Sequence, residues 1–228
     1  MKKIQLKQNK LSILRKSNYL PSFLSQALIG LILGVAHLSK SSPTSNTRFE
    51  LSFKGIYLPF ASYIYALFIY YIGSKPNILN TKSNISDKLY GSIRLKSLTL
   101  PIFNYYHNLF YQWDISLGKW IKFVPSNIKD LMTPVVLAFL IMGDGNYDKS
   151  RNRVRIYTNS FTYSECLLLA NAIEQKCGIK TSVMHDRNNQ YIRPNTIGAK
   201  ELDKLRSLVS EHMHPTMNYR IGLPNSTI

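Results

Sequence analysis

Three arginines at alternate positions, Arg151, Arg153 and Arg155, form the clearest charged pattern in the sequence. Alternate residues of a strand point to the same face, so this spacing predicts one strand face that carries three guanidinium groups. Such a face can bind the phosphates and bases of a nucleic acid, or it can simply be solvated. The overall charge favours nucleic acid, because 29 Lys and Arg against 12 Asp and Glu give a net charge of +17.

Acidic residues, which metal-dependent or acid/base chemistry would need, are unevenly distributed. Residues 1–110 contain 14 Lys or Arg but only two acids, Glu50 and Asp87, and the remaining acids follow in residues 111–228. Two cysteines and five scattered histidines are too few for a disulfide framework or a four-ligand zinc site. Any carboxylate chemistry is therefore expected from the second half of the chain.

Two apolar segments, residues 28–36 and 137–145, resemble each other when they are aligned without gaps. LIGLILGVA and LAFLIMGDG share four of nine positions, and both end in a small-x-small triplet. The alignment places Val35 opposite Asp144, an offset of 109 residues. We interpret the chain as two tandem copies of one unit.

The segments after each copy are also alike. Hydrophobic periodicity predicts α-β-β-α-β-β-α in each half, an α+β fold. The ranges predicted as strands are 48–54, 77–82, 89–97, 153–158, 180–185 and 190–193. The ranges predicted as helices after the two apolar segments are 59–72, 100–112, 162–176 and 199–210.

The two apolar segments are predicted to be helices that pack against each other. The Gly30-x-x-x-Gly34 spacing lets two helix backbones approach closely, although an ordinary buried helix can also contain two glycines. The second copy favours the paired interpretation. The expected interface residues are Gly30, Gly34, Ala138 and Gly143.

A run of 20 uncharged residues, Gly55 to Ser74, is long enough to span a membrane. Its composition argues against this, because Pro59 and five tyrosines are spread through it and its most apolar residues recur at helical spacing. We expect no membrane span and interpret the run as a helix packed on a sheet. A membrane-associated basic protein remains the third alternative.

These motifs and their surroundings resemble the LAGLIDADG homing endonuclease family in its single-chain, two-motif form. The second copy matches six of the nine motif letters and the first matches four, and the similarity covers roughly residues 20–223. The resemblance implies two pseudo-symmetric repeats whose antiparallel four-stranded sheets form a saddle for nucleic acid, with the motif helices packed at the interface. On this basis the predicted parts are a basic extension (1–20), a degenerate first repeat (21–125), a second repeat (126–223) and a tail (224–228).

In this family one acid at the foot of each motif helix binds a shared divalent metal, so the resemblance implies that Asp144 is a catalytic metal ligand. Mg²⁺ is the cofactor expected if any cleavage activity remains. Val35, at the matching position, has no oxygen with which to bind a metal, and no Asp or Glu occurs before Arg48. The sequence thus predicts that double-strand cleavage is lost or reduced to nicking.

Two basic residues, Lys122 and Arg220, resemble the family's basic residues beside each scissile phosphate. They are candidate catalytic residues, and a phosphate clamp without catalytic duty is the alternative. Besides the three arginines above, the basic residues predicted on or beside strands, and therefore expected to bind nucleic acid, are Arg48, Lys54, Arg94, Lys96, Lys180, Arg187 and Arg193.

The resemblance implies a monomer with an internal pseudo-two-fold axis that binds nucleic acid, and structured RNA is favoured over DNA. The expected role is that of an intron maturase or a component of a ribonucleoprotein such as the ribosome. The alternative is an active, site-specific homing endonuclease that cuts DNA with Mg²⁺. High Asn, Ile, Lys and Tyr usage indicates an AT-rich gene, so a mitochondrial, intron-encoded origin is expected.

Overall fold

The computed structural model describes residues 12–13, 19–82, 89–184 and 195–225. The chain forms two compact units, each described here by itself. The first unit comprises residues 1–24 and 36–109, and the second comprises residues 25–35 and 110–228. The first apolar segment forms α2 (Ser22–Leu33), so most of this helix belongs to the second unit although it precedes most of the first.

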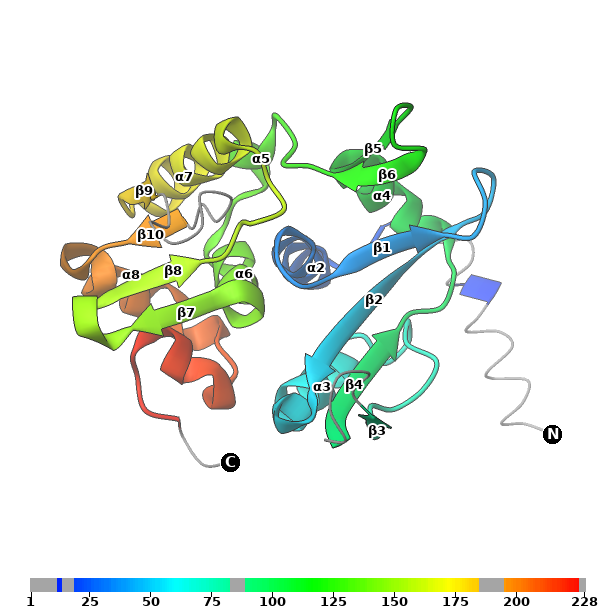
Figure 1. The fold of residues 1–228 in the computed structure, drawn as a ribbon, viewed down its shortest axis with the longest axis horizontal. Coiled ribbons are helices and arrows are strands. Elements are labelled where there is room, and N and C mark those ends of the chain that lie inside the picture. Colours follow the sequence, from blue (N-terminus) through cyan, green and yellow to red (C-terminus); the bar gives the residue numbers. More distant parts are fainter. Residues whose placement is uncertain (1–11, 14–18, 83–88, 185–194, 226–228) are drawn as a thin grey trace. The chain divides into compact units, whose positions relative to one another are not determined.

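The first unit contains an antiparallel sheet with strand order β1-β2-β4-β3, called the first sheet below (Figure 1). Its strands are β1 (His37–Lys40), β2 (Thr47–Lys54), β3 (Ile78–Lys82) and β4 (Leu89–Lys96). Alternation in β2 buries Phe49, Leu51 and Phe53 on one face and places Glu50 and Ser52 on the other. This strict period of two is what a sheet needs when only one face is covered.

Helices α3 (Leu58–Leu67) and α4 (Asn104–Phe110) belong to the same unit. Phe60 and Ile64 of α3 are fully buried, and the Phe60 ring lies 5.5 Å from that of Phe53 on β2. Phe49 contacts Phe68 and Phe103 edge to face, each at 5.2 Å between ring centroids. The uncharged run thus contributes Phe60 and Phe68 to the aromatic core of this unit, with one face of the sheet left open.

The second unit contains a matching antiparallel sheet with strand order β7-β8-β10-β9, called the second sheet below. Its strands are β7 (Gly145–Asp148), β8 (Arg153–Ile156), β9 (Thr181–Val183) and β10 (Asn195–Ile197). Val154, Ile156 and Ile197 are fully buried on its inner face. Figure 1 shows β7 and β8 side by side, with α6, α7 and α8 around them.

The helices of the second unit have clear sequence boundaries. The second apolar segment forms α6 (Pro134–Asp144), where Thr133 accepts a hydrogen bond from Val136 N and Pro134 occupies the first turn. Helix α7 (Tyr163–Cys177) begins with a capping box between Thr162 and Glu165 and ends at Gly178, whose φ is 65°. Short helices α5 (Ile128–Leu131) and α8 (Leu202–Val209) complete the unit.

A two-stranded hairpin also belongs to the second unit. Strand β5 (Tyr111–Asp114) pairs with β6 (Lys119–Lys122), and Figure 1 shows the hairpin set apart from the four-stranded sheet of its unit. The turn includes Gly118 at a φ of 59°, where the left-handed backbone favours glycine.

The predicted α+β fold with two α-β-β-α-β-β-α repeats is confirmed: the elements run α2-β1-β2-α3-β3-β4-α4 and α6-β7-β8-α7-β9-β10-α8. Strands β1 and β7, for which the sequence suggested no separate range, follow the motif helices directly. The helix predicted to Gln112 ends at Phe110, because Tyr111 and Gln112 pair with β6. The strand predicted at 190–193 lies outside the described residues, and β10 begins at Asn195.

Within the described part of the chain, no helix is long and apolar enough to cross a membrane. The uncharged run contributes only the ten residues of α3 as a regular helix.

Candidate functional site

The two motif helices pack backbone against backbone at Gly30. A Cβ atom placed on Gly30 would lie 2.4 Å from the Val136 carbonyl oxygen and 2.7 Å from Phe139 Cβ. Only glycine permits this approach, since real Cβ atoms do not come so close to backbone atoms. Ala138, also predicted at the interface, is fully buried on α6. The paired-helix interpretation is confirmed, and the closest approach is at Gly30.

The C-terminal ends of α2 and α6 then contact each other in a symmetric way. A Cβ atom placed on Gly34 would lie 3.5 Å from the Asp144 carboxylate, and one placed on Gly143 would lie 3.3 Å from Val35 Cγ1. Gly34 therefore faces Asp144, which follows Gly143, and Gly143 faces Val35, which follows Gly34. Val35 and Asp144 occupy equivalent positions in space, as the sequence alignment placed them.

Lys122 is positioned at the C-terminal end of α2 by strand β6. Its Nζ donates hydrogen bonds to the carbonyl oxygens of Ile32 and Gly34, each at 2.9 Å. Ile32 lies in the last turn of α2 and Gly34 directly follows the helix, where a cation is stabilised by unpaired carbonyls and by the helix dipole. Burial lowers the pKa of Lys122, and the Asp144 carboxylate partly offsets this.

Arg220 reaches the corresponding end of α6 from the short 3₁₀ segment Pro215–Ile221. Its guanidinium donates to the carbonyl oxygen of Gly145 and lies 5.6 Å from the ring centre of Tyr219. Burial raises the pKa of Asp144, while Lys122 and Arg220 act in the opposite direction. The structure thus brings together the three predicted catalytic residues.

The charge balance of this site bears on whether Mg²⁺ fits it. Two cationic side chains, Lys122 and Arg220, act on one carboxylate, Asp144, and apolar Val35 stands where a second carboxylate would be. Across residues 12–13, 19–82, 89–184 and 195–225, no group of three or more His, Cys, Asp or Glu that could hold a metal ion is found. The side chains present therefore do not complete a Mg²⁺ site, which needs several hard oxygen ligands.

The open face of the first sheet carries four of the predicted nucleic-acid-binding residues. Arg48 and Lys54 lie on β2, and on the neighbouring β4 Lys96 is opposite Glu50 and Arg94 is opposite Ser52. These residues alternate with the buried core residues and are partly or fully exposed. One face of the sheet therefore concentrates positive charge, as the sequence predicted for these positions.

Glu50 lies in the middle of this basic face. Its carboxylate is 2.7 Å from Arg48 Nε and 3.3 Å from Lys96 Nζ, and Ser39 Oγ on β1 donates to it at 3.1 Å. Burial would raise the pKa of Glu50, but the hydrogen bonds from Arg48, Ser39 and Lys96 outweigh it, and the pKa lies below its ordinary value. Glu50 holds two basic side chains in place, a role that sequence reasoning missed.

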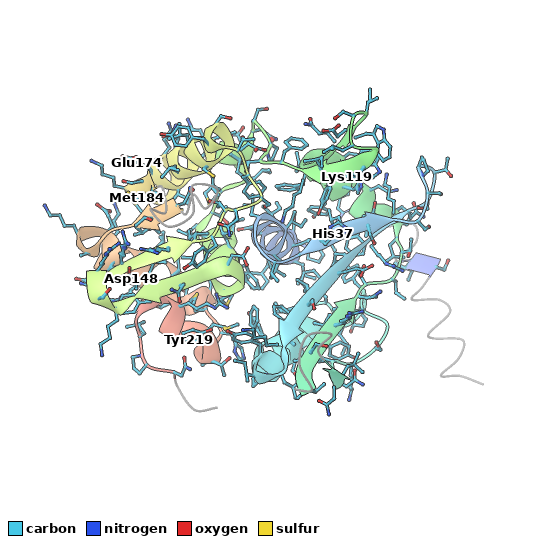
Figure 2. All side chains as sticks on the ribbon, viewed as in Figure 1. His37, Lys119, Asp148, Glu174, Met184 and Tyr219 are labelled. Atoms are coloured by element: carbon cyan, nitrogen blue, oxygen red, sulfur yellow. The ribbon has the colours of Figure 1, made fainter. Side chains whose placement is uncertain are left out.

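The second sheet has a similar cluster around Asp148, the last residue of β7 (labelled in Figure 2). Arg153 Nε lies 3.1 Å and Arg155 Nη2 lies 3.4 Å from Asp148 Oδ2. A hydrogen bond from Ser150, together with Arg153, lowers the pKa of Asp148 to about 2. Asp148 therefore orients both arginines on the second sheet.

The prediction that Arg151, Arg153 and Arg155 share one strand face is wrong for Arg151. This residue ends the 3₁₀ turn Lys149–Arg151, and Asn152 follows in the left-handed conformation with a φ of 45°. The strand begins only at Arg153, so only two of the three side chains alternate on it. The sequence features that indicate this turn are Ser150 and Asn152, residue types that favour turns.

Lys180 is exposed and immediately precedes β9, whereas Arg187 and Arg193 lie outside the described residues. The β5–β6 hairpin was also missed by the sequence prediction. The sequence feature that could have indicated this hairpin is a pair of tryptophans, Trp113 and Trp120, on either side of a turn ending in Gly118.

Comparisons with known proteins agree with this architecture. A model of the LAGLIDADG DNA endonuclease family matches residues 25–202. The cytochrome b mRNA maturase bI2 of Saccharomyces cerevisiae is 23% identical over 199 residues, covering 86% of this chain but only 46% of the yeast protein. The chain thus spans about half the length of that relative.

Two further comparisons involve endonucleases. The intron-encoded endonuclease ai4 of Dictyostelium discoideum is 28% identical over 150 residues, covering 64% of this chain and 87% of the relative. The homing endonuclease I-WcaI, solved bound to its DNA recognition sequence, has the same fold with a TM-score of 0.82 at 20% identity. That match covers 95% of this chain and 93% of the other.

Proposed function

Because the chain belongs to the LAGLIDADG DNA endonuclease family, we propose that it binds nucleic acid on its two sheets and has lost double-strand cleavage. The observation that carries this proposal is the reciprocal contact of Gly34 with Asp144 and of Gly143 with Val35. Cutting both strands requires a competent carboxylate for each. Only the α6 end supplies one.

The remaining charges at the helix ends suit a phosphate better than a divalent cation. The site has two cations, Lys122 and Arg220, and one carboxylate, Asp144, on which both cations act in a partly buried environment where electrostatic interactions are strong. An anionic phosphodiester placed there would restore charge balance. A divalent cation would increase the positive excess.

We favour structured RNA as the ligand and a maturase or ribonucleoprotein role in an organelle. The yeast relative is named as a maturase of cytochrome b mRNA, and other relatives are named as intron-encoded. These names, together with the AT-rich character of the composition, support a mitochondrial origin. Loss of cleavage would not affect such a role, since binding depends on the sheets rather than on a metal.

The test is to crosslink the protein to nucleic acid in its native organelle and to sequence what is bound. Recovery of one structured intron or ribosomal RNA supports the proposal. The recovered ligand and its DNA counterpart are then incubated with the wild-type protein and Mg²⁺ or Mn²⁺. Metal-dependent double-strand cleavage of a defined DNA site, abolished by Asp144→Asn, would overturn the loss of cleavage.

The second candidate function is a site-specific endonuclease that retains partial activity. The observation that favours it is that Asp144, Lys122 and Arg220 remain together at the end of α6. This candidate expects one strand of the target DNA to be nicked. Strand-specific nicking in the same assay, lost in Asp144→Asn, would distinguish it from a binding protein.

A further inference from the structure

The β5–β6 hairpin presents two tryptophans with exposed rings. Trp113 and Trp120 are directly paired across the hairpin, and their ring centroids lie 5.6 Å apart at an interplanar angle of 70°. Trp113 is 51% exposed and Trp120 is 37% exposed. Two large aromatic rings exposed next to each other form a surface on which a planar ligand can stack.

The tryptophan pair lies on the same face of the hairpin as Lys122. Alternate residues of a strand share a face, so Trp113 lies with Tyr111, and Trp120 lies with Lys122. Tyr111 is buried, and Lys122 is anchored to the α2 carbonyls beside Asp144. One hairpin face therefore runs from the helix-end site to the exposed rings, and it is fixed at the site end.

The separation along this face matches a nucleic acid strand. Trp120 precedes Lys122 by two residues, which is about 7 Å along a strand. A stacked nucleic acid strand advances about 3.4 Å per nucleotide. A strand whose phosphate lies at Lys122 and Arg220 therefore has a base one or two nucleotides away that can reach the tryptophan pair.

Only an unpaired base can use such a surface. Inside a duplex, both faces of a base are covered by its neighbours, whereas a base in a loop or bulge can turn out and stack on an aromatic side chain. We propose that the Trp113–Trp120 hairpin binds an unpaired RNA base next to the phosphate held at the helix ends. This inference rests on the proposed nucleic-acid-binding function and assigns it a single-stranded element.

Charge favours RNA over a protein partner on this hairpin. Lys119 is exposed at the start of β6 (labelled in Figure 2), and Lys122 lies at its end. Asp114, the acid that pairs with Lys119, is engaged by Ser116 Oγ at 2.6 Å and by Leu117 N at 3.0 Å within the turn. Lys122 connects the tryptophan face to the basic helix-end site, which suits a phosphate backbone, whereas Lys119 lies on the opposite face of β6.

Intrinsic fluorescence provides a direct test, because the whole chain contains only two tryptophans and both are in this hairpin. The wild-type protein is titrated with a stem-loop RNA, with the same stem fully paired, and with oligouridine. We expect quenching by the stem-loop and by oligouridine, and little change with the paired stem. Equal quenching by the paired stem would overturn the inference.

Variants of Trp113 separate stacking from general affinity. Trp113→Ala should weaken stem-loop binding by about tenfold and leave binding to the paired stem unchanged, while Trp113→Phe should retain most of the stem-loop affinity. Arg48→Gln, on the first sheet, is the matched control and should weaken binding to both RNAs. Unchanged stem-loop affinity in Trp113→Ala, at an unchanged urea midpoint, would overturn the inference.

The outcomes also distinguish this inference from the function on which it rests. If no nucleic acid binds the wild-type protein, both fail. If both RNAs bind with the same affinity and the tryptophan fluorescence does not change, only the hairpin inference fails. If the fluorescence changes with protein concentration rather than with RNA, the hairpin contacts protein and the inference is wrong.

Discussion

The C-terminal ends of α2 and α6 share a backbone arrangement and differ in chemistry. Each helix places a glycine against the residue that follows the partner's glycine, and each is met by a cation, Lys122 at α2 and Arg220 beyond α6. Yet Val35 follows the end of α2, whereas Asp144 is the last residue of α6. The packing of the helices evidently does not require the carboxylate, so the fold can persist when the chemistry of one half changes.

The two sheets show the opposite relation. Both carry an acid that holds basic side chains, but the acid comes from a different strand position in each sheet. Ser39 pairs with Arg48 in the first sheet as Asp148 pairs with Arg153 in the second. The acid that holds the basic side chains is Glu50 on β2 in one case and Asp148 on β7 in the other. An acid that orients two basic side chains is thus present on both faces, at non-equivalent positions.

Substitutions at the helix crossing should have the largest effect. Gly30→Ala forces a Cβ atom against the Val136 carbonyl oxygen, and we expect a loss of about 1–3 kcal/mol in the free energy of unfolding. Gly34→Ala is the matched control, because its Cβ atom would make ordinary contacts at 3.5 Å. Urea unfolding of both variants measures the difference. Equal stability of the two would show that the crossing point is misplaced.

Restoring an acid at Val35 should create metal-dependent stability. Val35→Asp places a second carboxylate beside Asp144, so Mg²⁺ should stabilise this variant by about 1.4 kcal/mol at ten times its dissociation constant. The measurement is the thermal midpoint with and without Mg²⁺. Val35→Asn, which has a similar shape and no charge, should not respond. A response of the wild-type protein equal to that of Val35→Asp would contradict the proposed loss of the metal site.

The two arginine clusters should respond differently to neutralisation. The Arg48 side chain is 42% exposed and that of Arg153 is 11% exposed. Arg48→Gln should therefore act on binding, lowering the slope of log affinity against log salt by about 1 without changing stability. Arg153→Gln should lower stability by about 1 kcal/mol and change the slope less. The reverse pattern would show that Arg153 is the main phosphate contact.

The smallest effect is expected in the acid pH range. The pKa of Asp148 is lowered from 3.8 to about 2, so its ion pairs contribute stability above pH 3.8 that is lost as the pH falls through about 2. Asp148→Asn should remove this part of the pH dependence. Thermal midpoints between these pH values, compared with those of Glu50→Gln, measure the effect. An unchanged profile in Asp148→Asn would contradict the assigned ion pairs.

The architecture could be predicted from the sequence because the chain contains two copies of the same repeat. The repeated motif set the register that aligned Val35 with Asp144, and alternation in β2 predicted the open face with Arg48 and Lys54. These features follow from local periodicity, which a single sequence contains.

Features that depend on distant contacts were not predictable in the same way. The helix predicted to Gln112 stops at Phe110 only because β6 pairs with the next residues. The closest helix approach lies at Gly30 rather than equally at Gly34 and Gly143, since the crossing point depends on how two helices dock. Glu50 gained its role from Lys96, which lies 46 residues away in sequence and opposite it in the sheet.

The membership of α2 in the second unit has a consequence for synthesis. Seven consecutive residues of this helix, Ala27 to Leu33, are buried, and Gly30 contacts Val136, which the ribosome adds 106 residues later. At about 5–20 residues per second, the interval is roughly 5–20 s. During that time the apolar stretch from Ala27 to Leu33 has no folded partner in its own unit. We therefore expect the nascent chain to depend on a chaperone, and slowing translation between these helices should increase aggregation.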